Sequence, residues 1–159
     1  AGLLEPTIRR LLNDGQTALA LRLARALPDT PRTTELRLSA LLAAGRAAEA
    51  EALLALTPPD VMGGPVALAE AYLAVQRPDR ALSLIGDAGG VLEPGERHRV
   101  ALVRGEALLR AGQAAHAARV LGQVPRGSRF SARARELLAE AAAALGRPAL
   151  ARELAEQAQ

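Results

Sequence analysis

The 159-residue sequence contains no cysteine, no lysine and no tryptophan, and only one tyrosine and one phenylalanine. Without cysteine, disulfides and thiolate metal sites are excluded. Without aromatic bulk, the core must gain its stability from many small contacts between Leu and Ala side chains. Strands favour β-branched and aromatic residues, whereas Leu and Ala favour helices. The composition therefore predicts an all-α protein.

Long hydrophobic runs are also missing, since no stretch of roughly 18 or more apolar residues occurs that could span a membrane. No signal peptide is visible, so we expect a soluble protein of the cytoplasm or the periplasm. The chain begins at Ala1 rather than Met, and we expect it to have been part of a longer chain. All 20 basic residues are Arg, and the abundance of Arg, Ala, Gly and Pro indicates a GC-rich, bacterial genome.

What the sequence does contain is an internal repeat. Five segments align when a turn residue stands third in each: NDGQTALALRLARAL (13–27), AAGRAAEAEALLALT (43–57), AVQRPDRALSLIGDA (74–88), RAGQAAHAARVLGQV (110–124) and ALGRPALARELAEQA (144–158). The steps between turn residues are 30, 31, 36 and 34, and these residues are Gly15, Gly45, Gln76, Gly112 and Gly146. An alanine follows five positions after each turn residue: Ala20, Ala50, Ala81, Ala117 and Ala151.

The repeat has a direct physical interpretation as a hairpin of two helices. Glycine closes a helix in the left-handed conformation that most residues avoid, and the small alanine lets the second helix approach the first closely. Proline-containing breaks separate the hairpins. We therefore predict one domain, residues 1–159, made of about five antiparallel hairpins with approximate bounds 1–30, 31–61, 62–96, 97–130 and 131–159.

The spacing resembles degenerate tetratricopeptide repeats over nearly the whole chain. The family also has a small residue seven positions before the turn, and here that residue is Ala69, Gly105 or Ala139 in the last three repeats. Arg37 and Arg104 depart from the family, which usually places a large apolar residue there. The resemblance implies a right-handed solenoid with a concave groove lined by the first helices. It also implies a non-catalytic scaffold that binds a partner protein or peptide, in a bacterial envelope, secretion or regulatory assembly.

Residues suited to catalysis are scarce. The two histidines, His98 and His116, are too far apart to match a local metal-binding spacing. The glycine-rich stretch 86–97 lacks the Lys-Ser/Thr pair of a phosphate-binding loop. We therefore predict that the protein is not an enzyme and has no catalytic, cofactor-binding or metal-binding residue.

One stretch is strongly basic, because residues 108–135 hold six arginines and no acid. Three interpretations are open. The arginines could form ion pairs with glutamates of neighbouring helices. They could instead bind an acidic peptide or a C-terminal carboxylate, since a guanidinium donates two parallel hydrogen bonds to a carboxylate. They could also bind nucleic acid through its phosphates, although only Phe130 is available in this stretch to stack on a base.

The resemblance places several charged residues of the later repeats on or near the groove side, and Arg129 falls in the loop between the fourth and fifth hairpins. We predict that these residues bind the partner: Arg99, Arg110, Arg129, Arg133, Glu70 and Glu106. Nucleic-acid binding by the basic face of residues 97–135 is the alternative function. A weaker alternative is self-association through the first helix, which is apolar at Leu3, Leu4, Ile8, Leu11 and Leu12.

Overall fold

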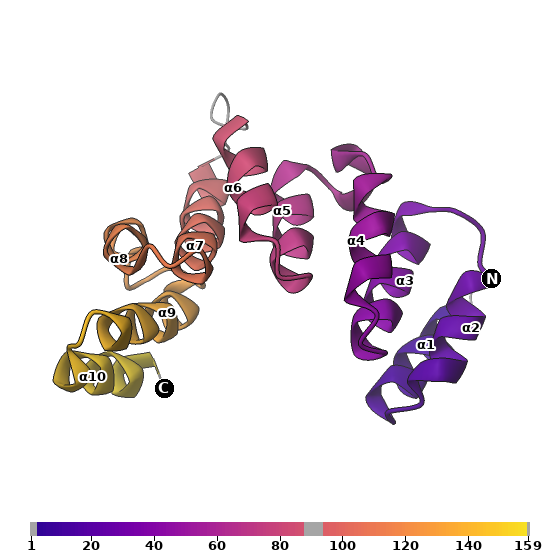
Figure 1. Ribbon diagram of the computed structural model, residues 1–159, viewed down its shortest axis with the longest axis horizontal. Coiled ribbons are helices and arrows are strands. Elements are labelled where there is room, and N and C mark those ends of the chain that lie inside the picture. Colours follow the sequence, from indigo (N-terminus) through magenta and orange to yellow (C-terminus); the bar gives the residue numbers. More distant parts are fainter. Residues whose placement is uncertain (1–2, 88–93, 159) are drawn as a thin grey trace. The chain divides into compact units, whose positions relative to one another are not determined.

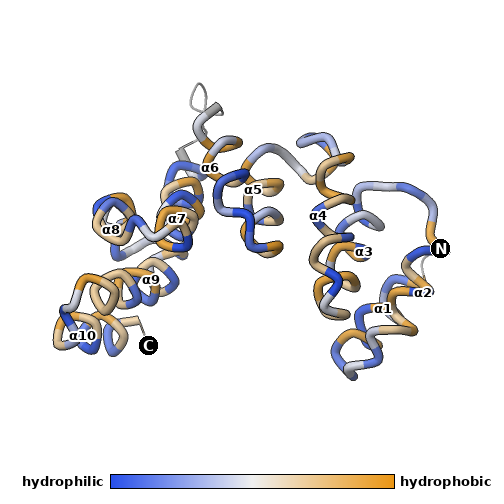
Figure 2. Tube along the Cα trace, viewed as in Figure 1, coloured by the Kyte–Doolittle hydropathy of each residue, from blue (hydrophilic) through white to orange (hydrophobic). Residues whose placement is uncertain are grey.

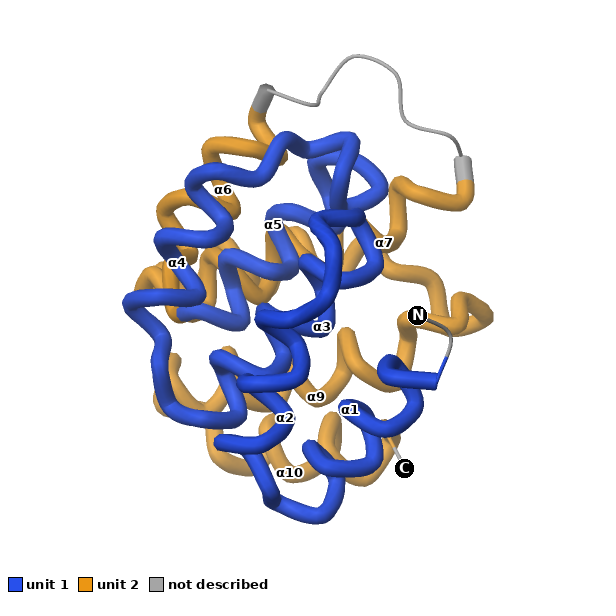
Figure 3. The backbone as a smooth tube through the Cα atoms, turned by 90° about the vertical axis from the view of Figure 1, so that its right-hand side faces the viewer, with its two compact units in different colours: residues 1–75 blue, residues 76–159 orange. Residues whose placement is uncertain are grey.

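The computed structural model describes residues 3–87 and 94–158. Over these residues the chain is built from helices joined by short turns, without a strand (Figure 1). The all-α prediction is confirmed. Apolar and hydrophilic stretches alternate along most helices (Figure 2), so that one face can be buried while the other meets solvent. The chain divides into two compact units, residues 1–75 and 76–159 (Figure 3), and the boundary falls in the turn of the third predicted repeat.

Unit 1 consists of two complete hairpins and the helix that follows them. In each hairpin the two helices pack against one another, and the first helices of the two hairpins, α1 and α3, are also in contact. A short 3-10 helix and two glycines connect the second hairpin to the last helix. The elements are α1 (Leu4–Asn13), α2 (Thr17–Arg25), α3 (Pro31–Ala43), α4 (Ala47–Ala55), η1 (Pro59–Met62) and α5 (Pro65–Ala74).

Unit 2 repeats this arrangement. Each helix packs against the next along the chain, and the first helices of its two complete hairpins, α7 and α9, are in contact as well. Buried side chains of α7, α8 and α9 form one core cluster. The elements are α6 (Pro78–Asp87), α7 (Pro94–Arg110), α8 (Ala114–Leu121), α9 (Ser131–Ala144) and α10 (Pro148–Ala158).

The five predicted turn residues all adopt the left-handed backbone. Their φ angles are 73° (Gly15), 71° (Gly45), 63° (Gln76), 83° (Gly112) and 74° (Gly146). At the first turn, the Gly15 N–H donates to the Leu12 carbonyl (3.1 Å) and the Gln16 N–H donates to the Leu11 carbonyl (2.8 Å). The same pair of bonds recurs at the other three glycines. It satisfies carbonyls at the end of the first helix that would otherwise have no partner.

The alanine that follows each turn serves two purposes. Its N–H closes the first turn of the second helix, as at Ala20, which donates to the Gln16 carbonyl (3.1 Å), and the bond recurs in the other four repeats. Its side chain is small, and four of the five are fully buried: Ala20, Ala50, Ala81 and Ala117. Ala151 is half-buried because its helix, α10, packs chiefly against α9.

Gly105 shows why a small residue precedes the turn. A β-carbon built at this position on α7 would overlap the side chain of Leu121 on α8. Leu121 is fully buried in the core cluster. The absence of a side chain at Gly105 is therefore what allows α7 and α8 to pack at this distance.

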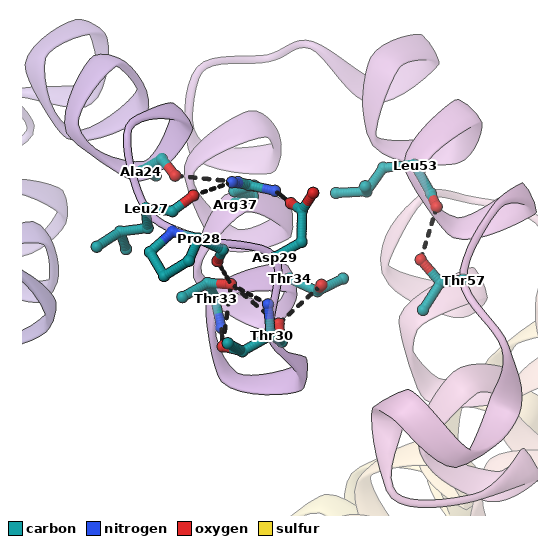
Figure 4. Close-up of polar contacts among 10 residues, drawn as sticks. All are labelled: Ala24, Leu27, Pro28, Asp29, Thr30, Thr33, Thr34, Arg37, Leu53 and Thr57. Carbon is teal, nitrogen blue, oxygen red and sulfur yellow. Dashed lines mark hydrogen bonds and ion pairs between the residues drawn. The ribbon is translucent and has the colours of Figure 1, made fainter. Parts of the chain in front are cut away.

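Arg37, on α3, stands where tetratricopeptide repeats usually have a large apolar residue, and its guanidinium makes hydrogen bonds instead. Its side chain is only 17% exposed. Nε donates to the Ala24 carbonyl (3.0 Å), Nη2 donates to the Leu27 carbonyl, and Nη1 pairs with Asp29 (Figure 4). The Ala24 carbonyl, in the last turn of α2, also accepts from the Leu27 N–H (3.3 Å), and the Leu27 carbonyl lies just beyond the end of the helix. The guanidinium therefore caps the end of α2 from the next repeat.

The start of α3 is fixed by the loop residues that follow this cap. The Thr33 N–H donates to Thr30 Oγ1 (3.3 Å), and the Thr30 N–H donates to Thr33 Oγ1 (2.9 Å) (Figure 4). This reciprocal capping box holds the entry into the second hairpin. The capping box therefore fixes where α3 begins, close to the hydrogen bonds between Arg37 and the end of α2.

The apolar first helix is largely covered within unit 1. Ile8 is fully buried, and Leu11 and Leu12 are half-buried. Leu3 and Leu4 remain exposed, at 86% and 38%. Self-association through this helix stays a prediction, and it now depends on Leu3 and Leu4 alone.

Candidate functional site

Arginines and glutamates of α7 and α9 form a continuous row of ion pairs. Arg133 Nη2 lies 3.1 Å from Glu106 Oε1, and Arg133 Nη1 lies 2.9 Å from Glu136 Oε2. Arg110 Nη1 lies 2.8 Å from Glu140 Oε2, and its Nη2 lies 3.8 Å from Glu106 Oε1. We call these five residues the α7–α9 ladder. It joins the first helices of two successive repeats.

The ladder carries two positive and three negative charges, so it is acidic by one charge. The hydrogen bond to Glu136 and the charge of Glu106 raise the pKa of the Arg133 guanidinium above its ordinary value. An incoming carboxylate would have to displace a glutamate already paired with the arginine. The first interpretation of the basic stretch, ion pairs between neighbouring helices, therefore accounts for Arg110 and Arg133.

The remaining predicted binding residues lie outside the ladder. Arg99 is half-buried on α7, and Glu70 is exposed on α5 in unit 1. Arg129 is exposed in the loop before α9, and its guanidinium lies 4.8 Å from the centroid of the Phe130 ring. The structure therefore brings together three of the six predicted residues, Arg110, Arg133 and Glu106.

Sequence reasoning missed a hollow of about 830 Å³ in unit 1. It lies along α2 and is closed by the turn between α3 and α4, and we call it the α2 hollow. The residues that line it include Thr17, Leu19, Arg22, Arg25, Ala44 and Arg46. No acidic side chain lines it.

A smaller hollow of about 450 Å³ occurs in unit 2, along α8 and the turn between α9 and α10. We call it the α8 hollow, and its lining includes Ala114, His116, Arg119 and Leu145. Arg22 and Arg119 each stand seven positions after the turn glycine of their repeat. This shared position is the sequence signal that could have revealed both hollows.

The described residues contain no group of three or more His, Asp or Glu side chains that could hold a metal ion. Of the helices that the structure describes, none combines the length and the apolar content of a membrane span.

The recurring left-handed turn, the alanine five positions later and the contacts between successive first helices define a TPR-like helical-repeat fold. The comparisons with solved structures agree, so the predicted resemblance is confirmed at the level of the fold. One similar structure is described as the nearly identical TPR-like repeats of a kinesin light chain from Podosopora anserina, with a TM-score of 0.67 and 23% identity. The match covers 98% of this chain and 91% of that chain.

A single-substitution variant of the same Podosopora anserina protein gives a TM-score of 0.69, with the same identity and coverage. No protein-family model matches the sequence, and a comparison with curated proteins finds no match. The similarity to the solved structures concerns the fold alone.

Proposed function

We propose that this chain is a non-catalytic scaffold that binds a partner protein or peptide along the first helices of its repeats. The observation that carries the proposal is a glutamate at one repeat position, six residues before the turn, in repeats three to five: Glu70, Glu106 and Glu140. Arg110 links two of them, Glu106 and Glu140, across successive repeats. Within unit 2, a partner segment that runs across α7 and α9 would meet these charged groups at the spacing of one repeat.

The ion pairs favour binding because they order the surface in advance. Long side chains lose rotamer freedom when a partner immobilises them, and this loss weakens association. In the α7–α9 ladder the side chains are already held by one another but remain partly exposed, at 39% for Arg110 and 44% for Arg133. They can therefore contact a partner with little further ordering.

Nucleic-acid binding by residues 97–135 is the alternative function. Its support is the exposed loop arginine Arg129 beside the Phe130 ring, which could stack on a base. Arg110 and Arg133 give nucleic-acid binding less support than Arg129 does, because a phosphate would have to compete with the glutamates that pair with them. We therefore give preference to a protein partner.

The test compares three immobilised proteins in capture from an extract of the source organism, followed by mass spectrometry. They are the parent chain, the double variant Arg110→Glu/Arg133→Glu, and the control Arg152→Glu, whose exposed arginine lies on α10 outside the ladder. We expect a protein that the parent and the control retain and the double variant loses. Circular dichroism would establish that both variants remain as helical as the parent.

Two results would overturn the proposal. One is that the parent retains no protein above bare resin. The other is that the double variant retains every captured protein as well as the control does. Loss of binding after nuclease treatment of the extract would replace the proposed protein partner by nucleic acid.

A further inference from the structure

The α2 hollow combines an apolar floor with a basic rim. Ala18, Arg22 and Arg25 are spaced so that they lie along one face of α2. Leu21, which also lines the hollow, is 5% exposed, whereas Leu19 at the edge is 37% exposed. A side chain entering here would find aliphatic carbon beneath it and guanidinium groups around it.

Three arginines line the hollow, and one carboxylate stands next to it. Glu49, at the start of α4, pairs with Arg25 (3.1 Å) and with Arg46. Within residues 3–87 and 94–158, Arg22 has no ion pair with any acidic side chain. The group of four residues therefore keeps two positive charges, although the unit around it is rich in acids.

Comparison of the α2 and α8 hollows shows that they share a shape but differ in charge. Leu19 corresponds to His116 and Ala44 to Leu145 when the turn glycines are aligned, so the same repeat geometry produces both hollows. Arg25, however, corresponds to Gly122. The hollow is thus a product of the repeat, and the three-arginine rim is particular to its first copy.

We propose that the α2 hollow binds an acidic segment of a partner protein. Carboxylates of the segment would pair with Arg22, Arg25 and Arg46, since guanidinium groups bind carboxylates through paired hydrogen bonds. An aliphatic side chain of the segment would cover Leu19. The inference rests on the proposed scaffold function and adds to it a second surface, on the second helix of the first repeat, with a stated partner chemistry. No aromatic residue lines the hollow to stack on a nucleic-acid base.

The test is a fluorescence anisotropy titration of the full chain. The probe is a rhodamine-labelled peptide of repeating Glu-Glu-Leu triplets, and its matched control replaces every Glu by Gln. We expect the acidic peptide to bind about tenfold or more tightly than the control at ~50 mM salt, because each exposed ion pair adds a few tenths to one kcal/mol.

Three variants locate the site. Arg22→Glu/Arg25→Glu should weaken binding of the acidic peptide about tenfold, whereas Arg119→Glu, at the equivalent position of the α8 hollow, should change it less than about twofold. Glu49→Gln should strengthen binding about twofold to fivefold, because it releases Arg25 and Arg46 from their resident carboxylate. A gain of affinity in this variant cannot result from misfolding.

The proposal would be overturned if the acidic and control peptides bound equally, if Arg119→Glu weakened binding as much as the double variant, or if Glu49→Gln left the affinity unchanged. A labelled single-stranded DNA that bound the same surface more tightly than the peptide would also overturn it. Failure of these titrations together with successful capture through the α7–α9 ladder would remove this inference and leave the scaffold proposal intact.

Discussion

Arg133 and Glu106 join the first helices of two successive repeats, with Nη2 of the arginine 3.1 Å from Oε1 of the glutamate. The pair shows how two of the six arginines in the most basic stretch of the sequence are neutralised in the fold. The acids that meet Arg110 and Arg133 come from outside residues 108–135, at positions 106, 136 and 140. A charge run in the sequence therefore becomes an alternating row once the helices pack side by side.

We expect Arg133→Glu to lower the free energy of unfolding by about 0.5–1 kcal/mol, because it places a third carboxylate beside Glu106 and Glu136, the two that Arg133 pairs with. The effect is modest since the Arg133 and Glu106 side chains are 44% and 25% exposed. The swapped variant Glu106→Arg/Arg133→Glu should recover only part of the loss, because the new glutamate lies beside Glu136 and the new arginine lies beside Arg110. Urea denaturation of the parent and both variants measures this. An Arg133→Glu variant as stable as the parent would show that the ladder contributes nothing to stability.

Gly105 provides a test of the helix packing. Gly105→Ala should destabilise the protein by about 1–3 kcal/mol, because the new methyl group would push Leu121 out of its buried position. Gly95, on the same helix, has open space where a β-carbon would lie. Gly95→Ala should therefore be neutral or stabilising by up to about 1 kcal/mol, as alanine favours helices. Thermal melts that rank the two variants in the opposite order would contradict the packing of α7 on α8.

Much of this fold could be predicted from the sequence because the repeat signal depends on short-range geometry. The left-handed turn favours glycine, as at Gly112, and the fifth position after it favours a small side chain, as at Ala117, so the pattern survives in an alanine-rich chain. The cap by Arg37 could not be predicted, since it depends on where the end of α2 lies relative to α3. The α2 hollow was hidden for a different reason. Residues 1–96 carry 12 acids and 9 arginines, and this net charge concealed a local group of three arginines.

The third turn differs from the others because Gln76 adopts φ 63° where the other repeats have glycine. The left-handed backbone is unfavourable for a residue with a side chain, whereas glycine gives the unfolded chain more conformational entropy. Because the first effect is larger, Gln76→Gly should raise the free energy of unfolding by about 0.5–1 kcal/mol. The reciprocal variant Gly112→Gln, at φ 83°, should destabilise it by a similar amount. Chemical denaturation at equal protein concentration compares the two. A loss of stability in Gln76→Gly would mean that the glutamine side chain makes contacts worth more than the strain.

Arg37 gives the sharpest test of how a polar residue can replace an apolar one between repeats. Arg37→Met keeps an unbranched stem of similar length but removes the donors to the Ala24 and Leu27 carbonyls. We expect a loss of about 1–3 kcal/mol, chiefly from the Leu27 carbonyl, because the Ala24 carbonyl still accepts from the Leu27 N–H. Asp29→Asn is the matched control, because Asp29 is 88% exposed and its ion pair should contribute less than about 1 kcal/mol. Hydrogen exchange should show faster opening at the end of α2 in the first variant only. If Arg37→Met were as stable as the parent, the hydrogen bonds of the guanidinium would contribute nothing. The apolar stem alone would then stabilise the contact between repeats, as the large apolar residue usual in tetratricopeptide repeats does.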